Sequence, residues 1–197
     1  MKEMGERVAK MPASFRILAK HGWYICGSSA MFDSLRLADQ INAGELDSAE
    51  DFLIEFYESE MESIIRRCSR EHPERTNILK EAEQAHQKEM FYASTLLFLA
   101  NADGILKGNL FILKKGKDDL KTYLKSNGHT SEFSQLIIDV STIDKFVAAN
   151  KFDKSFLNRH MVMHGHDSQY GTKKNSLKAL SLLAYVSDFF SPDPDHP

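Results

Sequence analysis

The chain of 197 residues is long enough to bury one hydrophobic core and short for two. Hydrophobic residues make up 42% and charged residues 27%, a balance that excludes the disordered and fibrous classes of protein. The net charge of −3 excludes a globally basic nucleic-acid coat. A polyanionic partner therefore has to be held by a local basic patch.

The cysteines and the distribution of apolar residues indicate the cellular compartment of the protein. Cys26 and Cys68 are the only cysteines, and their spacing matches no metal-binding motif. Two lone thiols fit a reducing cytosol better than a disulfide-built secreted domain. The start of the chain lacks the apolar segment of a signal peptide, and no stretch approaches the roughly 18 apolar residues that would span a bilayer. The sequence thus predicts a cytoplasmic protein with no membrane partner.

Apolar residues recur at helical spacing along most of the chain. The pattern predicts helices over residues 14–42, as one helix or a pair, and over 48–70, 74–101, 131–149 and 174–190. The longest of these, 74–101, is expected to be the central core helix, ended by Asp103-Gly104. Residues 105–127 fit either helix or strand, and we prefer helix because nothing nearby supplies a strand partner. The expected fold is an all-α, single-domain helical bundle over 1–197, with a flexible tail at 191–197.

Charges gather in two segments ahead of the C-terminal third. Residues 45–62 carry acids and no Lys or Arg, and Arg66, Arg67 and Arg70 follow. We interpret this order as complementing the helix dipole rather than as a surface for a basic partner. Residues 105–127 hold six lysines and two aspartates, a balance of +4, which is either a solvated face or a surface that tracks phosphates.

The chemistry of the chain is concentrated in residues 154–165. The apolar pattern predicts a short, mostly buried helix over 154–164, ended by Gly165. His164 then lies at the helix C-terminus, where the last carbonyls favour imidazolium. Arg159 carries a planar, permanent cation that suits phosphate. It precedes His164 by roughly one and a half turns at 3.6 residues per turn. The two side chains share no stripe, so a joint site needs a distorted last turn or a second copy of the chain.

Metal binding is a competing interpretation of the same segment. His160 and His164 are four residues apart, so both can face one ion, and His166 is close by. No cysteine lies near them, and Asp167 is the only nearby acid. No metal site is therefore assigned.

Residues Arg159 to His164 resemble the Arg-x4-His motif of the HEPN superfamily, with Asn158 before it and Gly165 after it. The resemblance extends downstream from Tyr170 to Leu180. Upstream it includes Arg75, Ala85-His86 and the stretch Ala102 to Ile105, although His86 by itself fits a structural place at the core edge. The resemblance implies a HEPN-like core over 70–190, with the motif at 158–165.

The resemblance implies a metal-independent endoribonuclease without a cofactor, acting as a homodimer in a toxin–antitoxin or phage-defence system, with an antitoxin or defence protein as a possible partner. Cleavage by attack of the RNA 2′-hydroxyl needs proton transfer and charge neutralisation. Two His164 side chains would share the acid and base roles, and Arg159 would neutralise the phosphorane. Asn158 would orient the Arg or the phosphate. His166 stands where some members carry a tyrosine that a partner nucleotidyltransferase modifies, so that regulation is not expected.

Basic residues around the motif give a second local excess. Residues 151–178 hold six Lys and Arg against two Asp, again +4. The side chains expected to contact RNA are Lys154, His160, His166, Tyr170, Lys173 and Lys174. The alternative is a non-catalytic HEPN-like module that binds RNA or a protein, since the superfamily includes such members. In a purely structural role, Arg159 would pair with an acid and His164 would satisfy the helix dipole.

Overall fold

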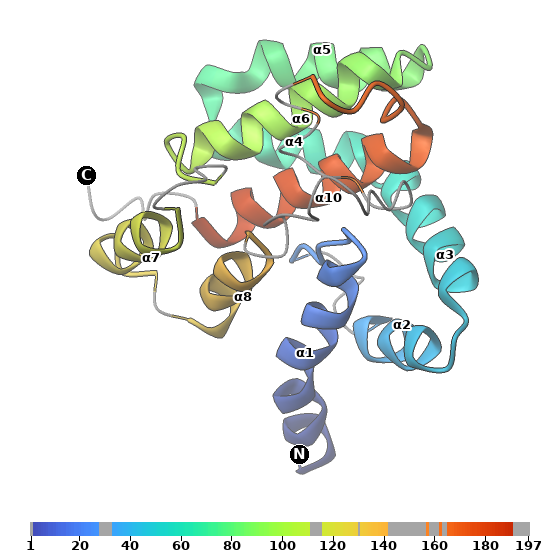
Figure 1. Ribbon diagram of the computed structural model, residues 1–197, viewed down its shortest axis with the longest axis vertical. Helices are drawn as coiled ribbons and strands as arrows, with labels where there is room; N and C mark the ends of the chain where they lie inside the picture. The colour runs from blue at the N-terminus through green and yellow to red at the C-terminus, as the bar shows by residue number, and fades with distance from the viewer. Residues whose placement is uncertain are drawn as a thin grey trace.

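A computed structural model describes residues 2–27, 33–110, 116–129, 131–141, 157, 162 and 165–190. All secondary structure among these residues is helical, which confirms the predicted all-α class (Figure 1). None of the helices in the described ranges is long and apolar enough to cross a membrane.

The helix at the centre of the bundle is α10 (Lys173–Phe190), which lies among the other helices in Figure 1. It is buried along most of its length, and Leu180 and Tyr185 are fully buried. It packs against α6 (Phe91–Ile105) most extensively and also contacts α3 (Leu46–Ser59), α4 (Met61–Glu71) and α8 (Glu132–Ser141). A helix apolar on all sides is one surrounded by protein. The central helix is thus the one predicted over 174–190 and not the one predicted over 74–101.

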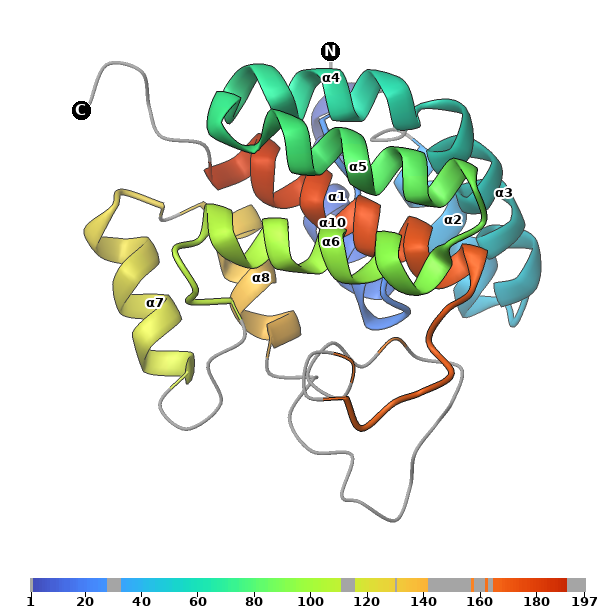
Figure 2. The same ribbon diagram turned by 90° about the horizontal axis from the view of Figure 1, so that it is seen from above.

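The predicted long helix over 74–101 is wrong, because the segment forms an antiparallel pair. Helix α5 (Thr76–Gln87) ends one turn before α6 begins, and the two pack side by side (Figure 2). Glu89 takes the left-handed conformation with φ +59°, and the Met90 amide donates to the Ala85 carbonyl at 2.8 Å. Left-handed backbone closes a helix end but is usually supplied by glycine. The reversal therefore leaves no glycine or proline signal in the sequence. Helix α6 also runs through Asp103-Gly104 to Ile105.

The helix predicted over 48–70 is also two helices. Helix α3 (Leu46–Ser59) and helix α4 (Met61–Glu71) meet at Glu60, whose φ of −94° and ψ of 0° leave the regular helix. Helix α4 ends at Glu71, close to the predicted end at 70, and the short helix η2 (Pro73–Arg75) follows.

The segment predicted as one helix or a pair is a pair, α1 (Lys2–Lys20) and α2 (Asp33–Asn42). Helix α1 begins earlier than predicted, because residues 6–10 are exposed and show no apolar stripe.

Helix α7 (Gly116–Ser126) confirms the preference for helix in that part of 105–127. Helix α8 (Glu132–Ser141) begins after Ser131, whose Oγ accepts a hydrogen bond from the Ser134 amide at 3.2 Å. The rest of the helix predicted to 149 lies outside the described residues, as do most of 154–164 and the tail 191–197.

Candidate functional site

The residues expected to perform catalysis are not among those that the structure describes. Asn158, Arg159 and His164 lie outside the described residues, and so do His160 and Lys154. The catalytic assignment therefore stays a prediction.

Three residues in or next to the motif are described by the structure: Leu157, Val162 and Gly165. Leu157 and Val162 are both buried, at 5% and 3% exposure, and both belong to the hydrophobic core. Gly165 has φ +71° and donates its amide to the Val162 carbonyl at 3.0 Å. This is the conformation expected of a glycine that ends a helix.

Residues 165–172, which we call the strap, are held against the start of α6 by Tyr92. The Tyr92 hydroxyl donates to the Ser168 carbonyl at 3.2 Å, and its ring meets that of Tyr170 edge-on at 5.1 Å. Gly171 lies so close to the Tyr92 ring that an added Cβ would approach it to 2.4 Å. The side chain of Asn175 donates to the Tyr170 carbonyl at 3.0 Å. Figure 2 shows the strap running past α6 into the start of α10.

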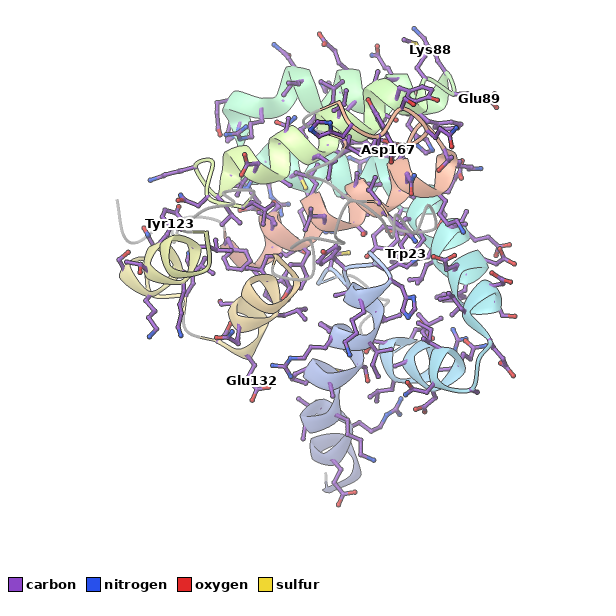
Figure 3. The ribbon with its side chains drawn as sticks, viewed as in Figure 1. Trp23, Lys88, Glu89, Tyr123, Glu132 and Asp167 are labelled. Atoms are coloured by element: carbon purple, nitrogen blue, oxygen red, sulfur yellow. The ribbon has the colours of Figure 1, made fainter. Side chains whose placement is uncertain are left out.

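Two of the expected RNA contacts, His166 and Tyr170, belong to the strap. His166 is exposed and Tyr170 is half-buried. Burial first, and then the neighbouring Tyr92 and Asp167, raise the pKa of the Tyr170 hydroxyl, so it stays protonated near neutral pH. Asp167 is in the same strap, on the outside of the bundle (Figure 3). One exposed imidazole beside a carboxylate is a mixed surface rather than a strongly basic one.

Lys173 and Lys174, the other two expected RNA contacts among the described residues, form ion pairs with acids of α3. Lys173 Nζ lies 2.5 Å from Glu58 Oε2, and Lys174 Nζ lies 2.7 Å from Glu50 Oε2. Lys178, counted in the same basic excess, is 2% exposed and pairs with Glu50 Oε1 at 2.7 Å. The basic excess after the motif is therefore largely offset by the acidic run of α3. Those acids do more than complement a helix dipole, because they connect α3 to α10.

Glu50 is the centre of a buried polar cluster with Trp23, Lys174 and Lys178. The Trp23 Nε1 donates to Glu50 Oε1 at 3.1 Å, and the Lys178 ammonium lies 5.5 Å from the centre of the Trp23 ring. Burial alone raises the pKa of Glu50, but hydrogen bonds from Lys174, Lys178 and Trp23 outweigh it and lower that pKa. Burial lowers the pKa of Lys178, which its bonds to Glu50 partly restore. Trp23 lies where the end of α1 approaches α3 and α10 (Figure 3).

A second buried cluster joins His86 of α5 to two serines. His86 Nδ1 lies 2.8 Å from Ser176 Oγ, which lies 2.7 Å from Ser94 Oγ. Burial lowers the pKa of His86, and Lys173 lowers it further against the opposing effect of Glu58. Ser176 is fully buried and cannot meet a substrate, so its contact with His86 is not a nucleophile–base pair. This agrees with the structural role predicted for His86.

Sequence reasoning missed both clusters, because their members are far apart in the chain. Glu50 and Lys178 are separated by more than half of the sequence, and the acid appeared to be one of many on a solvated face. The one signal was the residue type: Lys178 stands in the most apolar predicted helix, where a buried lysine requires a carboxylate partner.

Within the described ranges, no group of three His, Cys, Asp or Glu side chains is arranged to hold a metal ion. The competing zinc interpretation depends on His160 and His164, which lie outside those ranges. Comparison of the chain with protein-family models, curated proteins and solved structures finds no match.

Proposed function

We propose that this protein is a metal-independent endoribonuclease of HEPN type that acts as a homodimer. RNA would be cleaved by attack of its own 2′-hydroxyl, with two copies of His164 as acid and base. Arg159 would stabilise the charge that develops on the phosphorane, and Asn158 would orient it. A toxin–antitoxin or phage-defence role, with an antitoxin or defence protein as partner, is part of this proposal.

The observation that carries the proposal is the Arg-x4-His sequence followed by a helix-ending glycine. Gly165 has the left-handed backbone that ends a helix, directly after His164 in the chain. A histidine at such an end experiences the partial negative charge of the last carbonyls, which stabilises the protonated form that a general acid needs. The all-α fold is compatible with a HEPN-like core.

The experiment compares the wild-type protein with Arg159→Ala and His164→Ala on structured and single-stranded RNAs in the presence of EDTA. We expect metal-independent cleavage that is lost in both variants by at least about 10²-fold, the usual contribution of a general acid or base. Lys80→Ala, which changes an exposed lysine of α5, is the matched control and retains full activity. Wild-type inactivity on all substrates sinks the enzyme proposal.

A mixture of the two inactive variants tests the shared cleft. If one copy of the chain can supply Arg159 and the other His164, mixed dimers regain part of the activity, whereas each variant alone stays inactive. Cleavage abolished by EDTA and restored by zinc would instead support the site at His160, His164 and His166.

A second candidate function is a non-catalytic module that binds RNA or a protein, and the ion pairs of Lys173 and Lys174 favour the protein-binding form. Both lysines are occupied by acids of α3, which leaves fewer free cations for phosphates than the sequence suggests. Retained RNA or protein binding without any cleavage is the result that selects this candidate.

A further inference from the structure

A cavity of about 330 Å³ opens where the α3–α4 junction faces the α5–α6 turn and the start of α10. This is the lower end of the size range of small-molecule sites. Met61 and Phe91 supply apolar lining, and Lys173 is the one lysine among the described residues that line it. The remaining charged lining is acidic and consists of Glu58, Glu62, Glu83 and Glu89.

Within this cavity, His86 presents a buried nitrogen without a hydrogen-bond partner. The side chain is 4% exposed, and its Nε2 forms no hydrogen bond. The opposite ring nitrogen, Nδ1, is occupied by Ser176, so Nε2 faces away from α10 toward Glu58, whose Oε1 is 3.9 Å away. Both His86 and Glu58 line the cavity. A buried polar atom without a partner is uncommon in proteins and calls for one, from a water, an ion or a ligand group.

The hydrogen-bond chain behind His86 can run in either direction. Ser94 Oγ lies 3.3 Å from the Phe91 carbonyl and 2.7 Å from Ser176 Oγ, so its hydroxyl proton can go to either acceptor. When Ser94 donates to Phe91, Ser176 donates to Ser94 and His86 Nδ1–H donates to Ser176, which leaves Nε2 as a lone-pair acceptor. In that tautomer Nε2 and the Glu58 carboxylate are two acceptors 3.9 Å apart, and a ligand with several N–H groups would satisfy both.

The charge around the cavity favours a cationic ligand over a neutral one. Four glutamates against one lysine leave an excess of three acids, and Arg66 offsets part of it by pairing with Glu62 at 2.6 Å. Burial first, and then the nearby Glu62, raise the pKa of Glu83. A cation placed beside Glu83 would favour its ionised form.

We propose that this cavity binds a small aliphatic diamine. One ammonium group would bridge His86 Nε2 and Glu58, the methylenes would lie on Met61 and Phe91, and the second ammonium would meet Glu83. The carboxylates stand on two walls, one from the α3–α4 junction and one from α5 and its turn, which suits a ligand with a cation at each end. The proposal is independent of the ribonuclease proposal and concerns a different set of residues.

The test is isothermal titration of the full chain with 1,4-diaminobutane, with 1,4-butanediol and chloride-matched NaCl as controls. We expect saturable binding of the diamine only. Glu83→Gln should weaken binding about fivefold, the effect of losing one partly exposed ion pair. Glu81→Gln, which changes an exposed acid of the same helix outside the cavity, leaves binding unchanged. Equal effects of NaCl and the diamine, or unchanged binding in Glu83→Gln, overturn the proposal.

Two further variants keep the test decisive if Glu83→Gln folds poorly. Glu62→Gln changes a largely exposed side chain and should also weaken binding, by about twofold. Lys173→Met removes a competing ammonium group and should tighten binding about threefold. If Lys173 instead completes the site as an intramolecular ligand, wild type does not bind the diamine, and that result overturns the proposal.

The ring signals of His86 in NMR spectra identify the bound position. They should shift on addition of the diamine, whereas the ring signals of His129, which packs on Phe190, should not. Lysine with both its amino and carboxyl termini blocked imitates a lysine side chain of a partner protein. If it binds and the diamine does not, the proposal of a diamine site is overturned.

Discussion

At the scale of single residues, Glu50 is the carboxylate on which the joint between α3 and α10 depends. It accepts from Trp23, Lys174 and Lys178, and it is the described partner of a lysine that is 2% exposed. Without that carboxylate, Lys178 would be a buried charge without compensation. Such a change destabilises more than the loss of a surface pair does.

We expect Glu50→Gln to lower the free energy of unfolding by about 3 kcal/mol, because it breaks a buried ion pair from one side. Urea denaturation at pH 7, followed by circular dichroism, measures the change. Glu55→Gln alters an exposed acid of the same helix and should change stability by less than about 0.5 kcal/mol. Equal stability of the two variants would contradict the role given to Glu50.

We expect Gly171→Ala to detach the strap from α6, because the new methyl group would approach the Tyr92 ring to 2.4 Å. Hydrogen exchange at the Gln169 and Thr172 amides, which donate within the strap at 2.8 Å, should become faster. Ser168→Ala is the matched control, since Tyr92 bonds to the backbone carbonyl there and exchange should not change. Unchanged exchange in Gly171→Ala would show that Tyr92 does not hold the strap.

At the scale of elements, the helix ends are where sequence and structure differ. The apolar pattern identified the helical segments and placed the start of α10 within a residue of Lys173. It joined α5 to α6 because the left-handed residue between them is Glu89 rather than glycine. The apolar periodicity shows which face of a helix is buried. The same spacing of apolar residues continues across a tight reversal, so it does not show where one helix ends and the next begins.

The same reversal gives a stability prediction. Left-handed backbone costs a non-glycine residue about 1 kcal/mol or more, so Glu89→Gly should raise the free energy of unfolding by about 1 kcal/mol. Glu89→Ala keeps the Cβ and should show no such gain, which separates backbone strain from loss of the charge. Chemical denaturation of the two variants in parallel provides the comparison, and a gain in Glu89→Ala equal to that in Glu89→Gly would rule out strain as the cause.

The candidate site could be predicted only in part, also for physical reasons. The Arg-x4-His pattern is local in sequence, so it can be found without a structure. The pairing of Lys173 and Lys174 with α3 acids is not local, and the charge balance of 151–178 alone suggested free cations. A basic stretch indicates a phosphate-binding surface only when its acidic partners elsewhere in the fold are known.

At the scale of the whole molecule, partly buried histidines connect stability to pH. Burial is the largest effect on His21, His72, His86 and His129, and it lowers the pKa of each below 6.5. Between the lowered pKa and 6.5 the unfolded chain binds more protons than the folded one. Folding stability therefore rises with pH across that window and is lost as pH falls through the folded-state values.

We expect the urea midpoint to fall between pH 7.5 and pH 5.5 at constant ionic strength. Glu83 acts in the opposite direction, since its raised pKa favours the folded state at lower pH, but it is one carboxyl group against four histidines. NMR titration of the ring protons should give midpoints below 6.5 for these four histidines. A urea midpoint that is equal or higher at pH 5.5 would contradict the prediction.

The central position of α10 has a consequence for synthesis of the protein. The helices that pack against it, among them α3, α4, α6 and α8, all precede it in the chain. As the polypeptide emerges from the ribosome, these earlier helices have apolar faces with no partner to cover them until residues 173–190 have been made. The core thus closes late, through contacts between distant parts of the chain, and the nascent protein passes through a stage in which it is prone to aggregate and suited to chaperone binding.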